Sequence, residues 1–227
     1  MALRPSDGAR TLADVALGEL REAIVSGEIP PGSPIRLQDY VGRLKMSSVP
    51  IREALRFLEQ KGLIERTPHR GVVVAAMSAA DLEDTYEIRL ELESRAVRLA
   101  TERISDEDRE RLTALVEEYS KASLAGLSSA RELHGDVHME LYGLSGSRWL
   151  HLILPMLWDN SERYRRLALP LRGTPEQRVE EHRLIVEACV SGDPDEAENA
   201  LRTHLSNSFE AAIAALHEFE GQGGTVT

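Results

Sequence analysis

The 227-residue sequence contains one cysteine and no long apolar run. A single thiol, Cys189, excludes an intramolecular disulfide framework. No apolar stretch approaches the roughly 18 residues that a membrane helix needs, and residues 1–15 lack the continuous apolar segment of a secretory signal. From these absences we expect a soluble, cytoplasmic protein without a membrane partner, and a hydrophobic content of 42% is enough to supply a core.

Positive charge is also scarce, since the formal net charge is −11 at pH 7. The imbalance is uneven, because residues 1–77 hold 11 Lys and Arg against 9 Asp and Glu, a net charge of +2, whereas the remainder carries −13. The predicted secondary structure also changes near residue 77, from helices that alternate with Gly/Pro turns to almost continuous helix. We expect two domains, 1–77 and 78–220, and a flexible tail, 221–227, with any polyanion bound by the first domain.

Residues 12–77 predict three helices followed by a β-hairpin. Apolar residues recur at helical spacing over 12–27 and 37–46, and a third helix over 47–62 has Ser47 or Ser48 as its N-cap. Two β-rich runs then flank "PHR", which is typical of a hairpin. Three helices and a hairpin describe a winged helix-turn-helix. For the third helix taken alone, an ordinary helical domain with solvated arginines is the alternative.

In a winged helix-turn-helix the third helix lies in the DNA major groove with its N-terminal residues near base edges. Arginines on its outward face can pair with guanine or grip a phosphate, and basic residues at the wing tip suit a narrow minor groove or a phosphate. The predicted DNA-binding residues are Arg36, Ser47, Ser48, Arg52, Arg56, His69, Arg70 and Gly71.

The second part of the chain predicts six helices with clear start signals. Ser78, Ser105, Thr174 and Asp193 each stand three residues before an acidic or amide partner, which is the capping-box arrangement. Six helices in about 150 residues form an antiparallel bundle. The predicted fold class is therefore mainly α, with a winged helix-turn-helix followed by an all-α bundle, and bundles place ligand and metal sites between facing helices.

Two of the seven histidines lie four residues apart in "RELHGDVHMEL", residues 131–141. His134 and His138 therefore share one helix face, and His182 and His204 lie on faces of two later helices that also carry apolar residues. Each alone is more often a satisfied core or surface histidine. Together they favour a metal site, because neutral imidazoles are the usual transition-metal ligands.

Residues 17–77 resemble the DNA-binding domain of the GntR family of bacterial transcription regulators, through "IVSGEIPPG", "SSVPIREALRFLEQKGL" and "TPHRGVVV". Residues 80–216 resemble the helical effector domain of its FadR subgroup, the FCD domain, through "RLELE", "HGDVH", "EEH" and "GDPDEAENALRTH". In metal-binding members an aspartate and three histidines are the ligands. Those positions fall on His134, His138, His182 and His204, so histidine replaces aspartate at position 134.

Four imidazoles carry no negative charge, so a bound divalent ion would keep its +2 charge. A site made only of nitrogen ligands favours zinc, nickel or copper. We expect zinc, or else nickel. Metal binding should weaken as the histidines protonate below about pH 6.5. The resemblance also implies a small organic acid at or beside the metal, with Arg89 facing it. A surface salt bridge to Glu93 is the alternative for Arg89. From helix geometry alone, we expect Asn207 and Ser208 to face the same effector site.

These features predict a homodimeric, metabolite-responsive regulator that acts as a repressor on a palindromic operator, with a small carboxylate changing the arrangement of two winged-helix domains. A purely structural metal is one alternative. A metal-dependent enzyme is another, although the chain has no H-E-x-x-H motif and no carboxylate suitably placed at the histidines. No catalytic residue is predicted.

Overall fold

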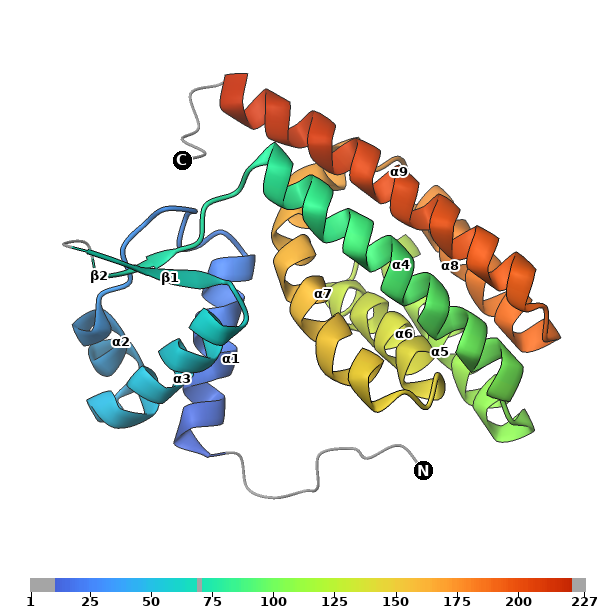
Figure 1. Cartoon of the computed structure of the whole chain (residues 1–227), viewed down its shortest axis with the longest axis horizontal. Helices are drawn as coiled ribbons and strands as arrows, with labels where there is room; N and C mark the ends of the chain where they lie inside the picture. The colour runs from blue at the N-terminus through green and yellow to red at the C-terminus, as the bar shows by residue number, and fades with distance from the viewer. Residues whose placement is uncertain (1–10, 69–70, 222–227) are drawn as a thin grey trace.

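The computed structural model describes residues 11–68 and 71–221, which form two units joined by residues 75–78 (Figure 1). The first unit has three helices and a two-stranded antiparallel sheet, as the sequence predicts. Its elements are α1 (Leu12–Val25), α2 (Leu37–Leu44), α3 (Ser48–Gln60), β1 (Ile64–Thr67) and β2 (Gly71–Val74).

Local signals fix these elements. Thr11 and Asp14 form a capping box at the start of α1, and Ser47 is the N-cap residue of α3. In the sheet, Ile64 pairs with Val74 and Thr67 with Gly71. The apolar faces of α1 and α3 meet in a core that includes the buried side chains of Ala16, Leu20, Ile51, Ala54 and Leu58. This unit is thus a winged helix-turn-helix.

The second unit is an all-helical bundle, which confirms the predicted fold class. Its helices begin at the predicted caps, since Ser105 and Thr174 form complete capping boxes and Ser78 accepts a hydrogen bond from the backbone of Asp81. The last helix ends at Gly221, the first residue of the predicted tail. The elements are α4 (Ala79–Arg103), α5 (Asp106–Leu124), α6 (Ala130–Leu144), α7 (Arg148–Ala168), the 3-10 turn η1 (Leu169–Leu171), α8 (Pro175–Ser191) and α9 (Pro194–Gly221).

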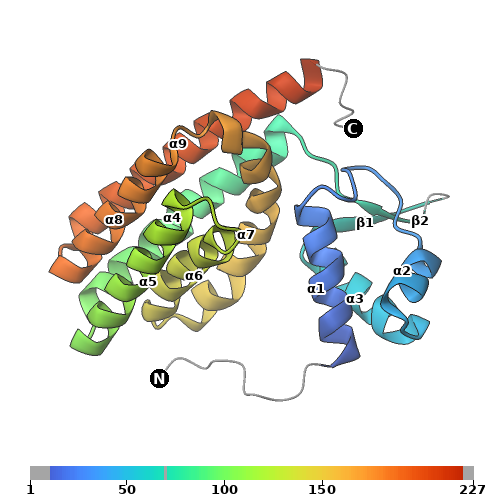
Figure 2. The same cartoon turned by 180° about the vertical axis from the view of Figure 1, so that it is seen from behind.

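Helix α4 is central, because α6, α7, α8 and α9 all pack against it. In the view from behind, α5, α6 and α8 lie in front of α4 (Figure 2). A continuous apolar core runs between these helices, with Leu141, Leu154, Ile185 and Leu201 almost fully buried. No helix within residues 11–68 and 71–221 combines the length and apolar character that a membrane span requires.

The two units touch through α1 and α7. Asp159 on α7 is buried, with its side chain 5% exposed, and it accepts hydrogen bonds from two cations of the first unit. Arg21 on α1 donates Nε to Oδ1 at 2.8 Å, and Lys61, just after α3, donates Nζ to Oδ2 at 2.8 Å. Arg131 on α6 also pairs with Glu22 on α1. One carboxylate of the bundle therefore holds two helices of the winged unit.

Candidate metal centre

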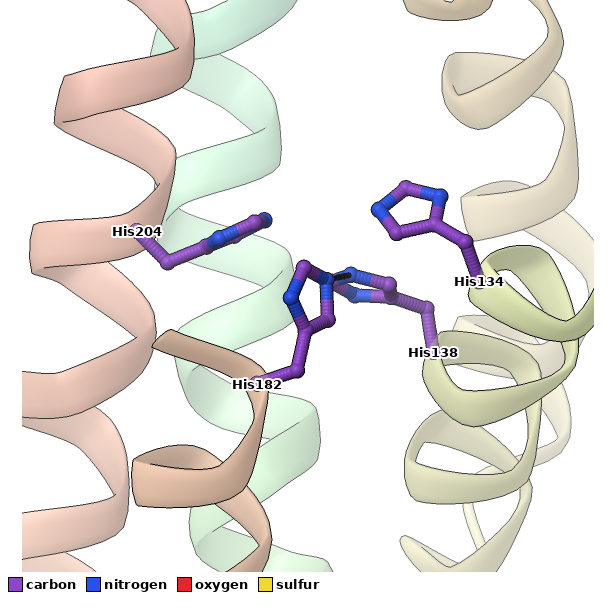
Figure 3. A group of neighbouring side chains, drawn as sticks. All are labelled: His134, His138, His182 and His204. Carbon is purple, nitrogen blue, oxygen red and sulfur yellow. Dashed lines mark hydrogen bonds between the residues drawn. The ribbon is translucent and has the colours of Figure 1, made fainter. Parts of the chain in front are cut away.

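Four histidines meet in the middle of the bundle. His134 and His138 come from α6, His182 from α8 and His204 from α9, and one ring nitrogen from each lies within 4.8 Å of the others. Figure 3 shows the four rings converging from the three helices. All four side chains are buried, from 0% exposed at His138 to 6% at His134. The structure brings together every residue of the predicted metal set.

Hydrogen bonds determine which nitrogen of each ring has a lone pair available to bind a metal. His182 directs Nδ1 at the backbone oxygen of Arg178 at 2.6 Å, so Nδ1 carries the proton and donates. His204 Nδ1 lies 2.8 Å from Glu181 Oε2 and donates to that carboxylate. In both rings Nε2 is left unprotonated, with its lone pair available to a metal.

His138 is fixed by a longer chain of contacts. Its Nδ1 lies 2.9 Å from the hydroxyl of Tyr142, and that hydroxyl donates to the carboxylate of Glu93. Since the Tyr142 proton is committed to Glu93, the hydroxyl accepts from His138 Nδ1, and His138 Nε2 is also unprotonated. The Nε2 atoms of His138 and His182 lie 3.1 Å apart. Two facing lone pairs at that distance repel each other unless a cation lies close to both.

His134 is held by rings instead of hydrogen bonds. Its centroid lies 5.1 Å from that of Trp158 and 5.8 Å from that of Tyr119. Its Nδ1 is buried and has no partner among the described residues. A buried polar atom without a partner is costly, and a metal ligand bond is one way to satisfy it.

The electrostatics favour neutral imidazoles. Burial lowers the pKa values of His134, His138 and His182 well below the ordinary 6.5. Burial also lowers the pKa of His204, although the Glu181 carboxylate opposes that change. Neutral rings with free Nε2 atoms, facing lone pairs and one orphaned nitrogen form a donor set that fits a zinc or nickel ion.

Arg89 lies behind this group and does not line the cavity next to it. Arg89 is 4% exposed, its Nε donates to Glu93 Oε1 at 2.6 Å, and its Cζ lies 5.6 Å from the centroid of the Trp158 ring. The pair with Glu93 weighed from the sequence is therefore present, but it is buried and not on the surface. Through Glu93 and Tyr142, Arg89 supports the orientation of His138.

A cavity of about 620 Å³ opens beside the histidines. Five arginines and three of the four histidines line it, and no carboxylate is among the described residues that do so. Three of these arginines pair with acids outside the cavity lining, at Glu22, Glu162 and Glu181. The other two, Arg166 and Arg178, have no carboxylate partner among the described residues. The arginines that line the cavity are Arg131, Arg165, Arg166, Arg172 and Arg178, and the histidines are His134, His182 and His204.

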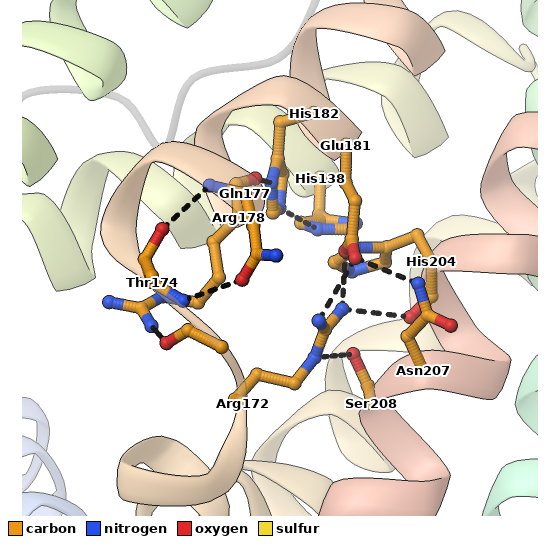
Figure 4. Close-up of polar contacts among 11 residues, drawn as sticks. His138, Arg172, Thr174, Gln177, Arg178, Glu181, His182, His204, Asn207 and Ser208 are labelled. Carbon is orange, nitrogen blue, oxygen red and sulfur yellow. Dashed lines mark hydrogen bonds and ion pairs between the residues drawn. The ribbon is translucent and has the colours of Figure 1, made fainter.

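Arg172, which lines this cavity, pairs with Glu181 behind the lining (Figure 4). Arg172 donates Nη1 to Glu181 Oε1 at 3.0 Å and Nε to Ser208 Oγ at 3.1 Å. Burial alone would raise the pKa of Glu181, but hydrogen bonds from His204 and Arg172 lower it to about 2. Ser208 lines the cavity, as helix geometry predicts. Asn207 does not; it donates Nδ2 to Glu181 Oε1 at 2.8 Å and faces a separate hollow.

The predicted DNA-binding residues that the structure describes lie on the surface of the winged unit. Arg36, Arg52 and Arg56 are exposed, and their side chains form no hydrogen bond or ion pair with any described residue. Ser47 and Ser48 stand at the start of α3, and Gly71 opens β2 with a φ of +75°, which suits glycine. His69 and Arg70 lie outside the described residues.

Several site residues escaped sequence reasoning. Tyr142 follows His138 by four positions and could have been found from that spacing. Glu181, Arg172 and Trp158 could not, because each comes from a different element and its contact depends on how the helices are rotated. Their importance appears only when α7, α8, α9 and η1 are packed.

Comparison with known proteins places this arrangement in context. The family described as bacterial regulatory proteins, gntR family, matches residues 12–74, and the FCD domain matches residues 84–207. The uncharacterized HTH-type transcriptional regulator BphR of Paraburkholderia xenovorans is 28% identical over 226 residues, which cover 95% of this chain and 89% of BphR. The probable D-xylose utilization operon transcriptional repressor of Paenarthrobacter nicotinovorans is 31% identical over 191 residues, 81% of this chain and 80% of the repressor. E. coli McbR/YncC shares the fold with a TM-score of 0.76 at 23% identity, over 92% of this chain and 98% of its own.

Proposed function

Because the chain belongs to the GntR family of bacterial transcription regulators and carries an FCD domain, we propose that it is a homodimeric repressor controlled by a small carboxylate. The carboxylate would bind in the arginine-lined cavity, at or beside a divalent metal held by the four histidines. Membership of this family shows that the chain is a transcription regulator and not an enzyme. The metal, the effector, the operator and the dimer are the parts that we propose.

The lining of the cavity carries the proposal. Of its five arginines, Arg166 and Arg178 have no ion pair with a carboxylate among the described residues, and the lining residues described include no acid that would repel an anion. A guanidinium pairs with a carboxylate in a planar fork. A cavity of about 620 Å³ also lies within the range of ordinary small-molecule sites.

A zinc or nickel ion on His134, His138, His182 and His204 would add a Lewis acid at the edge of the same cavity. The histidine at position 134 leaves this set without a carboxylate, so the bound ion would keep its full charge and attract an anionic effector more strongly. A purely structural metal is the second candidate, and burial of all four rings favours it. The two candidates differ in whether the carboxylate response needs the ion.

The exposed end of α3 supports DNA binding. Arg52 and Arg56 lie four residues apart on one face and are free of ion pairs among the described residues, so both can reach phosphates or guanine edges. Val49, in the first turn of α3, is 69% exposed. An apolar side chain at that position suits the methyl group of a thymine.

An apolar stripe on α7 supports the homodimer. Trp149, Leu152, Ile153 and Met156 follow helical spacing and are all exposed, Trp149 by 66%. Four large apolar side chains on one exposed helix face mark an interaction site, and a two-fold dimer would bury the same stripe of each copy. Two winged units placed by such a dimer would meet two half-sites of a palindrome.

Helix α7 also links the cavity to the DNA-binding unit. Trp158 packs on His138 with centroids 4.7 Å apart, and the next residue, Asp159, holds Arg21 and Lys61. One turn later, Glu162 pairs with Arg165, which lines the cavity. A shift of α7 on effector binding would therefore move the attachment of the winged unit.

The test is a thermal-shift screen of malate, citrate, gluconate and lactate on zinc-loaded protein. We expect at least one acid to raise the melting temperature, and Arg178→Met to abolish the rise. Arg183→Met is the matched control, since Arg183 lies on the same helix and is absent from the cavity lining. If the rise persists after zinc is removed by a chelator, the ion is structural. If no acid raises the melting temperature, the sensor proposal is wrong.

A further inference from the structure

A second cavity, of about 500 Å³, lies between the winged unit and the bundle. The winged unit contributes the end of α1 and Val74 of β2, and the bundle contributes α7 and the last turns of α9. Most of its wall is apolar, including Ile24, Leu167, Leu216 and Phe219. Of all its residues, only Arg166 is shared with the histidine cavity.

Arg163 in this wall is a buried cation that has no ion pair with any residue that the structure describes. It is 5% exposed, and Nη2 donates to the backbone oxygen of Ala76 at 2.8 Å. Its Nε and Nη1 are buried and have no hydrogen-bond partner among the described residues. The two other buried arginines in the described chain, Arg89 and Arg172, each pair with a carboxylate. A buried charge that lacks a partner is destabilising, so Arg163 is the exception that needs an explanation.

Burial lowers the pKa of Arg163, although Tyr164 and two acids, Asp81 and Glu65, oppose the change. An arginine nevertheless keeps its charge in proteins. The described structure gives none of these acids an ion pair with Arg163, so their charges act only from a distance. Arg163 is one of the residues that line the apolar cavity.

A second cation stands at the edge of this cavity. Arg166 is exposed and has no side-chain hydrogen bond or ion pair with a described residue. Arg163 and Arg166 follow one another by three positions on α7, so both reach the same side of that helix. An anion entering the cavity would find one buried and one exposed guanidinium, and the apolar wall would cover the rest of the molecule.

We propose that this cavity binds an amphiphilic carboxylate, a molecule with one carboxylate and an unbranched or aromatic apolar body. The carboxylate would supply the negative counter-charge that is missing at Arg163, and the apolar body would lie between α1, α7 and α9. A small polar acid of the kind proposed for the histidine cavity would leave this apolar wall empty. A ligand here contacts both units at once and therefore fixes how the DNA-binding unit sits on the bundle. This site does not involve the four histidines, although Arg166 lines both cavities.

Isothermal titration with octanoate on the full-length protein tests the proposal. We expect octanoate to bind, octanamide, which has the same chain without the charge, to bind about tenfold more weakly or worse, and acetate, which lacks the apolar body, not to bind. Arg163→Met should lower octanoate affinity by about tenfold or more, and Arg183→Met should leave it unchanged. Equal binding of octanoate and octanamide would overturn the charge argument, and failure of octanoate to bind would overturn the site.

A second variant guards against a folding defect in Arg163→Met. Phe219 is half-buried in the last turn of α9, so Phe219→Asp places a negative charge in the cavity wall without disturbing the core. We expect it to abolish octanoate binding while zinc binding at the histidines stays at the wild-type level. If octanoate fails to bind and these variants instead change the mass measured by light scattering, a second copy of the chain covers this cavity and the proposal is wrong.

Discussion

Replacing Tyr142 with phenylalanine removes one oxygen atom from the chain of contacts that orients His138. The hydroxyl is buried, accepts from His138 Nδ1 at 2.9 Å and donates to the Glu93 carboxylate. Hydrogen bonds to a charged group contribute about 1.5–3 kcal/mol, and a buried donor left without a partner costs about 1–3 kcal/mol. Since Glu93 keeps its pair with Arg89, we expect Tyr142→Phe to lower the free energy of unfolding by about 2–3 kcal/mol.

The same change should weaken metal binding although all four histidines remain. Loss of a hydrogen-bonded group behind a ligating histidine typically costs about 10–100-fold in affinity. Zinc affinity is measured at pH 7.5 by competition with a chromophoric chelator, and stability is measured by urea unfolding of the metal-free protein. Tyr119→Phe is the matched control, because the Tyr119 ring packs on His182 and His134 but its hydroxyl bonds neither of them. Unchanged zinc affinity in Tyr142→Phe would refute the idea that this chain prepares His138 as a ligand.

Three further changes test other parts of the molecule, and a fourth tests its pH dependence. Arg52→Ala should weaken binding to operator DNA by about 1–3 kcal/mol and reduce the salt dependence of retention on DNA; unchanged retention would exclude α3 as the reading helix. Asp159→Asn should speed hydrogen exchange of α1 amides by loosening the two cations that it holds, while exchange in α4 stays the same; slow exchange in α1 would show that the apolar contacts hold the units without it. Met156→Glu should convert a dimer to a monomer in sedimentation because it places a charge in the apolar stripe of α7, and a variant that stays dimeric would locate the dimer interface elsewhere. The hydrogen bond from Ser105 lowers the pKa of Asp108 below its ordinary 3.8, so this cap contributes fully to the stability of α5 above pH 3.8 and loses its contribution as the pH falls through the lowered pKa. Asp108→Asn should therefore lower the melting temperature at pH 7, and the difference from wild type should shrink as the pH falls below 3.8.

Much of the fold follows from local signals. Capping boxes such as Thr174 with Gln177 fix where helices begin, and apolar periodicity fixes which face is buried, so the order and kind of elements can be read along the chain. The histidine group was also predictable, because His134 and His138 share a face and the family motifs add the other two. The hydrogen-bond partners behind those histidines were not.

Rotation of one helix against another decides those partners. Successive residues of a helix differ by about 100° in direction, so Ser208 lines the cavity while its neighbour Asn207 turns toward Glu181. Contacts between the units are harder still to predict, since Asp159 meets Arg21 across 138 positions of the sequence. No spacing rule reaches that far.

The contact at Asp159 separates two tasks within one chain. Its two oxygens are each taken by a different cation, one from α1 and one from just after α3, so the attachment constrains the angle of the winged unit as well as its distance. Within the described part of the chain, no hydrogen bond or ion pair joins these three side chains to the exposed arginines of α3 or to the four histidines. Substitutions that alter the DNA sequence read by α3, or the acid accepted by the bundle, can accumulate independently as long as this three-residue joint is kept.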